Sequence, residues 1–143
     1  MDDIKLQAIQ LLERRYQKPI HTVAAVLVAK NGTKFEGINI DHFSGFICAE
    51  TCALANAINA GEVEFETIIA VRKEPDGTVA VANPCGKCRQ IFHDYCPSIN
   101  FVVQDSDELK LVSVENLLPY SFKRQQQKIT EARANNNAQE VVG

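Results

Sequence analysis

The chain has 143 residues, of which 45% are hydrophobic and 23% are charged, and its formal net charge at pH 7 is -3. A chain of this length is most simply one domain that buries roughly two-thirds of its unfolded surface, so it needs no disulfides. The negative charge disfavours a nucleic-acid polymer as partner. The longest apolar run, residues 22–29, is much shorter than the ~20 residues of a membrane span, so no membrane segment is expected. We therefore expect a small-molecule partner.

The first half of the chain predicts a helix, a β-hairpin and a second helix. Apolar residues recur at helical spacing up to Tyr16, and Pro19 ends that pattern. Two β-favouring runs then flank Asn31 and Gly32, and this dipeptide is a strong hairpin signal. An alanine-rich run stops at Gly61, the residue type that most often follows a helix end. These elements are expected at residues 4–16, 21–30, 34–40 and 48–60.

The second half predicts further strands and a helix, followed by a polar tail. The elements are a strand at 66–73, a strand or extended segment at 79–85, a helix at 86–96, strands at 99–105 and 109–114, and a short element at 115–122. Residues 1–122 are expected to form a single domain with a three-layer α/β sandwich. The tail, residues 123–143, is expected to be partly helical up to Ala134 and otherwise disordered, because its composition buries little apolar surface.

Five cysteines occur in a chain that starts with an acidic, amphipathic segment and lacks the pattern of a signal peptide. We therefore expect a cytoplasmic protein, in which cysteine pairs more often bind metal or do redox chemistry than form disulfides.

Three of these cysteines open predicted helices. Residues 84–90 read Pro-Cys-Gly-Lys-Cys-Arg-Gln and contain Cys85 and Cys88, while Cys48 opens the other helix two residues before Glu50. Zinc with three protein ligands keeps its fourth position for water and is catalytic, whereas structural zinc takes four protein ligands. We therefore predict that the three thiolates bind zinc and that Glu50 carries the proton of that water. The helix N-termini, with Lys87 or Arg89, would offset the negative charge of the thiolates.

Residues 48–50, Cys-Ala-Glu, together with residues 84–90 resemble the signature of the cytidine deaminase family in its three-cysteine form. The resemblance covers about residues 18–122, and within the family residues 42–45, 65–72 and 105–110 are most similar to the blasticidin-S deaminases. It implies an α/β/α sandwich with a mixed five-stranded sheet, one zinc ion per subunit, and a homotetramer with shared active sites.

The resemblance also implies individual roles. By this resemblance, Cys48, Cys85 and Cys88 coordinate zinc and Glu50 is the catalytic proton shuttle. Backbone carbonyls near Asn83 and Pro84 hold the departing ammonia, and aromatic residues of the C-terminal segment close the active site, often that of a neighbouring subunit. The implied substrate contacts are His21, Asn39, Asp41, Ala49, Asn83, Pro84, Tyr120 and Phe122.

Three positions depart from the nucleoside enzymes of the family. Asn39 matches an asparagine that holds the ribose, but Asp41 replaces a longer glutamate. His21 stands where a phenylalanine stacks near the pyrimidine, and Thr51 stands where many members have an arginine, a role that Lys87 would take. The departures at His21 and Asp41 favour blasticidin S as an alternative substrate.

Simpler roles are open for several of these residues. Cys85 and Cys88 alone fit a redox pair, and Cys52 could complete a structural site of four thiolates, although core packing explains Cys52 better. Asp41 could cap or turn the chain, and Tyr120 and Phe122 could be core or interface aromatics. Structural or ordinary polar roles are expected for Cys96, His42 and His93.

The expected activity is hydrolysis of the C–N bond of a cyclic amidine. The expected substrates are cytidine and deoxycytidine, deaminated at C4 to give uridine or deoxyuridine and ammonia in pyrimidine salvage. Deamination of blasticidin S, a cytosine-bearing antibiotic, is the alternative. Editing of polynucleotides is disfavoured, because no basic, aromatic stripe occurs. A zinc-stabilised binding module without catalysis is the alternative from a different class.

Overall fold

A computed structural model gives the backbone of residues 1–142 and the side chains of residues 1–136. The helices are α1 (Asp2–Arg15), α2 (Ala49–Asn59), α3 (Gly86–Tyr95), α4 (Val114–Leu117) and α5 (Gln125–Val142). The strands are β1 (Val23–Ala29), β2 (Lys34–Ile38), β3 (Phe65–Lys73), β4 (Val79–Val81), β5 (Asn100–Asp105) and β6 (Glu108–Ser113). None of the described helices is long and apolar enough to cross a membrane.

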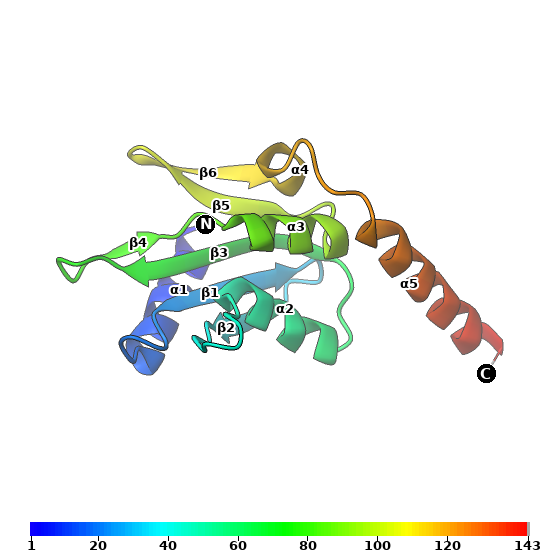
Figure 1. Cartoon of the computed structure of the whole chain (residues 1–143), viewed down its shortest axis with the longest axis horizontal. Coiled ribbons are helices and arrows are strands. Elements are labelled where there is room, and N and C mark those ends of the chain that lie inside the picture. Colours follow the sequence, from blue (N-terminus) through cyan, green and yellow to red (C-terminus); the bar gives the residue numbers. More distant parts are fainter. Residues whose placement is uncertain (143) are drawn as a thin grey trace.

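The strands form one mixed sheet (Figure 1). Its main path runs β2-β1-β3-β5-β6, and β4 pairs with β3 beside that path. The pairs are antiparallel except for β3 and β5, which are parallel because the chain crosses over between them through α3. This crossover carries α3 over the same face of the sheet as α2.

Both faces of the sheet are covered by helices. Ile68 of β3 joins a core cluster with Phe92 of α3, whereas the next residue, Ile69, joins a second cluster with Leu12 of α1. Successive residues of a strand point to opposite faces, so two apolar layers are buried, one beneath α2 and α3 and one beneath α1. The predicted three-layer α/β/α sandwich is thus confirmed.

Two elements go beyond the predictions. The segment predicted as strand or extended chain pairs with β3 as the short β4, so the sheet has six strands where five were predicted. The tail forms α5, which continues past Ala134, where the composition predicted the helix to end. Ile129 of α5 is buried, and the helix then projects away from the sandwich (Figure 1). The boundary at residue 122 stays a prediction.

Gly37 in β2 sets how closely α2 packs on the sheet. A Cβ at this position would lie 2.3 Å from the carbonyl oxygen of Ala49 and 2.4 Å from the amide nitrogen of Ala53. Both are backbone atoms, so a side chain here would displace α2 itself. The close approach therefore positions the first turn of α2, which carries Ala49 and Glu50.

Candidate metal centre and active site

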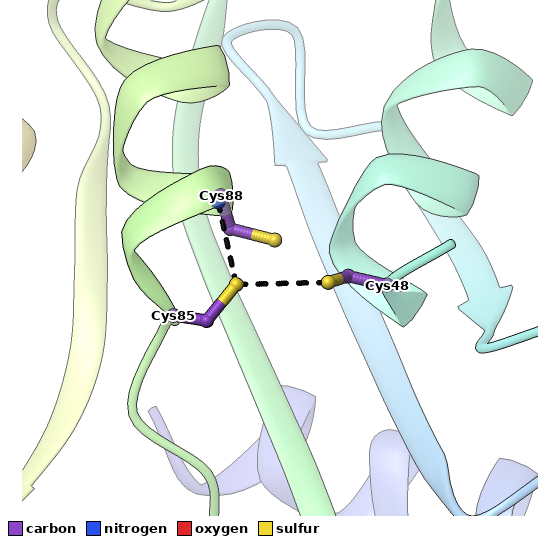
Figure 2. Close-up of side chains that lie close together, drawn as sticks. All are labelled: Cys48, Cys85 and Cys88. Atoms are coloured by element: carbon purple, nitrogen blue, oxygen red, sulfur yellow. Dashed lines mark hydrogen bonds between the residues drawn. The ribbon is translucent and has the colours of Figure 1, made fainter. Parts of the chain in front are cut away.

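Two helix N-termini bring three cysteines together. Cys48 and Cys85 are the N-cap residues of α2 and α3, and both have an extended backbone. Cys88 lies in the first turn of α3 and is fully buried. Because α2 and α3 cover the same face of the sheet, their first turns hold the three side chains close to one another (Figure 2).

The spacing of the three sulfur atoms fits a metal ion. The three Sγ atoms lie within 4.8 Å of one another, and those of Cys48 and Cys85 are 3.7 Å apart. Zinc bonds thiolate sulfur at about 2.3 Å, so ligands at the corners of a tetrahedron lie about 3.8 Å apart. The cluster can therefore supply three corners of a tetrahedral zinc site.

The surroundings shift the pKa values of the three thiols in different directions. Burial raises the pKa of the Cys48 thiol to about 11. Burial and the nearby Glu50 carboxylate raise the pKa of Cys88 well above its ordinary value. Burial also acts to raise the pKa of Cys85, but hydrogen bonds from the Cys88 N–H and the neighbouring thiols outweigh it and lower that pKa. A divalent cation deprotonates the thiols that it binds, so a bound metal would reverse the two upward shifts.

Lys87 and Arg89, the residues predicted to offset the thiolate charge, form hydrogen bonds with the loops around the cluster. The Nζ of Lys87 donates to the carbonyl oxygen of Phe46 at 3.1 Å. Arg89 donates from Nε to the carbonyl of Pro84 at 3.0 Å and from Nη1 to the carbonyl of Leu117 at 3.1 Å. The positive ends of the α2 and α3 dipoles lie at the cluster, because the cysteines stand at the N-termini of these helices.

Glu50 is buried beside the cysteines. It lies in the first turn of α2, is 6% exposed, and lines a cavity of about 160 Å³ together with Cys48 and Cys85. Burial raises the pKa of its carboxyl, and hydrogen bonds from its own backbone and from the Cys88 thiol offset only part of that shift. A carboxyl with a raised pKa can take up and release a proton closer to neutral pH.

Two predicted substrate residues, Asn39 and Ala49, also line this cavity, which we call the catalytic cavity. Ala49 is fully buried at the start of α2. The Oδ1 atom of Asn39 accepts hydrogen bonds from the backbone N–H groups of Thr22 and Val23 at 2.7 and 2.9 Å. This carboxamide therefore holds the start of β1 as well as facing the cavity.

Asn83 and Pro84 form the loop that leads into α3. The side chain of Asn83 exchanges two hydrogen bonds with the backbone of Gln104, at 2.8 and 3.0 Å, and so ties the loop to β5. Asn83 lines the catalytic cavity, whereas Pro84 is buried and its carbonyl accepts the hydrogen bond from Arg89.

The structure does not bring the other predicted substrate residues into the catalytic cavity. His21 lines a larger cavity of about 570 Å³ between α1, β2 and α2, and its Nδ1 lies 2.8 Å from the carbonyl oxygen of Asn39. Asp41 is exposed, and Tyr120 and Phe122 are 95% and 67% exposed in the single chain.

The remaining cysteines, and His42, lie outside the cluster. Cys52 lines the larger cavity, and the group of metal-capable side chains found among the described residues consists of Cys48, Cys85 and Cys88. Cys96 is buried in the core, and His42 is exposed.

Several contacts at the site were not predicted. The Oγ1 of Thr51 lies 3.9 Å from the Sγ of Cys88, within hydrogen-bonding reach for sulfur. Phe46 and Arg72 line the catalytic cavity. Thr51 carried a local signal, because it directly follows the Cys-Ala-Glu segment. Gly37, which packs against α2, also carried one, because an isolated glycine within a strand pattern indicates close backbone approach. Phe46 and Arg72 carried none, because their positions depend on the loop path and the strand register.

The chain is similar to known proteins over most of its length. Residues 2–103 match the family model described as the cytidine and deoxycytidylate deaminase zinc-binding region. The chain is 30% identical to a blasticidin-S deaminase of Bacillus cereus over 123 residues, which is 82% of this chain and 88% of that protein. It is 31% identical to a cytidine deaminase of Sporosarcina psychrophila over 107 residues, which is 72% of this chain and 76% of that protein.

Solved structures show the same architecture. The cytidine deaminase of Burkholderia pseudomallei superposes with a TM-score of 0.70 at 27% identity, over 85% of this chain and 98% of that one. The cytidine deaminase of Bacillus anthracis superposes with a TM-score of 0.72 at 22% identity, over 99% of this chain and 98% of that one, and shows the shared fold.

Proposed function

The chain belongs to the cytidine and deoxycytidylate deaminase family, and on that premise we propose that it deaminates a cytosine nucleoside at C4, releasing ammonia. Family membership makes the protein a hydrolase acting on C–N bonds with zinc as its cofactor. The proposal adds the substrates cytidine and deoxycytidine, a role in pyrimidine salvage, and the residues that do the work.

One observation carries the proposal: a buried carboxyl lines a small cavity together with two cysteines of the three-sulfur cluster. Glu50 takes one proton from the attacking water at its Oε and delivers it to the ring nitrogen, then takes a second proton from the hydroxyl group now on C4 and delivers it to the departing amine. Burial raises the pKa of this carboxyl, and a raised pKa makes the carboxylate a better proton acceptor for both steps.

Cys48, Cys85 and Cys88 would hold zinc through their Sγ atoms. When bound, zinc lowers the pKa of a coordinated water to about 7 and so provides the nucleophile at neutral pH. The contact from Thr51 to the Sγ of Cys88 supports this site, since such outer contacts orient metal ligands. Lys87 and Arg89 hold the loops around the cluster in place.

The catalytic cavity would take the cytosine ring against Asn39, Ala49 and Asn83. Within the proposed homotetramer, Tyr120 and Phe122 close the active site of a neighbouring subunit. The large exposed fractions of these two side chains support that role, because apolar surfaces of this kind are commonly buried in assemblies.

Deamination of blasticidin S is the second candidate. It is favoured by the exposed position of Asp41, away from the lining of the catalytic cavity, and by the use of the Asn39 Oδ1 within the protein. Both observations weaken the pair of side chains expected to hold a ribose. The 30% identity to the Bacillus cereus blasticidin-S deaminase favours the same candidate.

A parallel assay tests the proposal. Purified protein of known zinc content is incubated with cytidine, deoxycytidine, cytosine and blasticidin S, and ammonia release and the ultraviolet change of the ring are followed. Turnover of the nucleosides above that of blasticidin S supports the proposal, and the reverse order supports the second candidate. Absence of turnover on all four would reject both candidates in favour of another amine substrate or of the binding module.

A further inference from the structure

Arg72 brings a positive charge to the mouth of the catalytic cavity. It lies near the end of β3, beside Val23 of β1 and Ala80 of β4, and lines the cavity together with Glu50. Ile68 and Ala70, which precede it at alternate positions, belong to the core cluster beneath α2 and α3, so Arg72 points to the same face of the sheet as the cysteines.

The rest of the cavity lining is neutral or acidic. Among the lining residues in the described part of the chain, Arg72 is the one with a basic side chain and Glu50 is the one with a carboxyl group. The Nε of Arg72 donates to Oε1 of Glu74 at 3.1 Å, and 58% of the Arg72 side chain is exposed. Glu74 thus steadies the guanidinium through Nε, and the two terminal amino groups form the fork that binds oxyanions in two contacts.

Ring geometry directs one side of the substrate toward this fork. In cytosine, N1 lies across the ring from C4, so a ring with C4 at Glu50 and the cysteines presents N1 toward the cavity mouth. The cavity of about 160 Å³ is small beside the roughly 300 Å³ or more of sites that enclose a whole ligand. The group attached to N1 therefore extends out of the cavity, where the partly exposed Arg72 lies.

We infer that Arg72 recognises an oxyanion, a carboxylate or a phosphate, on the group attached to N1 of the cytosine ring. The inference rests on the proposed function, because it takes C4 to lie at Glu50. It makes anionic cytosine nucleosides better substrates than neutral cytidine. A hydrogen-bonded charge pair of this kind changes kcat/KM by about 10- to 100-fold.

Three substrates and two variants test the inference. The kcat/KM is measured for cytidine, cytidine 5′-monophosphate and cytidine 5′-carboxylic acid, and we expect at least one of the two acids to exceed cytidine about tenfold or more. Which acid does so identifies the source of the oxyanion. Arg72→Gln should reduce that preference about tenfold or more. Lys73→Gln removes the same charge from the next residue, whose Nζ lies 4.4 Å from the ring centre of Tyr16 on the other face, and should leave the preference unchanged.

Three results would overturn the inference: cytidine preferred to both acids, a preference that survives Arg72→Gln, or an equal loss in Lys73→Gln. Thermal unfolding of both variants checks that each is folded. If none of the three compounds is deaminated, the proposed function fails on its own. Calorimetry then measures binding of the same compounds. If the wild-type protein binds an acid more tightly than cytidine and Arg72→Gln does not, the inference is supported. If the acids and cytidine bind equally, it is rejected.

Discussion

The two cavities that α2 helps to line differ in size and in chemistry. The larger, of about 570 Å³, lies between α1, β2 and α2 and contains His21 and Cys52. The catalytic cavity, of about 160 Å³, contains Cys48, Cys85 and Glu50. The smaller cavity has the convergent reactive groups, so convergence at two helix N-termini, and not volume, locates the candidate active site.

Backbone geometry explains why two cysteines of one helix face different cavities. Cys48 is the N-cap of α2 and has an extended backbone, so its side chain is directed differently from those within the helix. Cys52, one turn into the helix, follows the helical path toward the larger cavity. The comparison predicts that substitutions at the catalytic cavity remove activity, whereas those at the larger cavity leave most of it.

Loss of a sulfur should have the largest effect. In Cys88→Ser we expect the zinc content to fall from about one per chain to near zero and deamination to fall below detection, because two sulfurs do not hold the ion firmly. Zinc content by elemental analysis and ammonia release measure this. Cys96→Ser, a buried cysteine outside the cluster, is the matched control and should keep its zinc. Full zinc content in Cys88→Ser would contradict the assignment.

Removal of the buried carboxylate should separate chemistry from metal binding. Glu50→Gln is expected to keep zinc but to lower kcat by about 10²- to 10⁴-fold, since the proton carrier is lost. Asp94→Asn changes the other buried carboxyl among the described side chains, which lies outside the catalytic cavity, and should leave kcat within about twofold. Wild-type turnover in Glu50→Gln would exclude the proton-carrying role.

Gly37 connects the two cavities, because it lines the larger one and packs against the helix start that lines the smaller one. Gly37→Ala should lower the free energy of unfolding by about 1–3 kcal/mol, as the added Cβ pushes on the backbone of Ala49 and Ala53. Urea denaturation measures the change. Gly86→Ala, where nothing lies within 4 Å of the new Cβ, should be neutral or stabilising. Equal stability of the two variants would show that β2 and α2 are not tightly packed at Gly37.

The smallest effect is expected in the larger cavity. His21→Gln removes the imidazole that contacts the Asn39 carbonyl, and we expect kcat/KM to fall by no more than about fivefold, the value of one ordinary hydrogen bond. Steady-state kinetics measures the change, with Glu50→Gln assayed alongside. A loss of a hundredfold or more would place His21 in substrate recognition, as its aligned position suggested.

Local patterns made most of the fold and the metal-binding cluster predictable. Helix starts, the Asn-Gly turn and Gly61 indicated the elements, and the cysteines at helix starts indicated the cluster. Gly61 adopts a φ of +92°, the left-handed conformation expected after a helix end. The continuation of α5 past Ala134 was not predicted, because Asn135, Asn136 and Asn137 have lower helix propensity than the residues before them.

The substrate contacts were less predictable, because they depend on how distant segments meet. The alignment of His21 suggested a place beside the pyrimidine, yet its side chain lines the larger cavity. Arg72 carried no sequence signal, because its position at the cavity mouth follows from the register of β3 between β1 and β4. Short motifs at helix starts therefore predict metal ligands better than they predict residues that the sheet brings together.

X-ray absorption at the zinc edge of the wild-type protein measures which atoms bind the metal. We expect three sulfur atoms at about 2.3 Å and one lighter atom as the zinc ligands, since Cys48, Cys85 and Cys88 leave the fourth position open. Four sulfur atoms, with Cys52 as the added ligand, would contradict it and make the protein a zinc-stabilised module without a catalytic site.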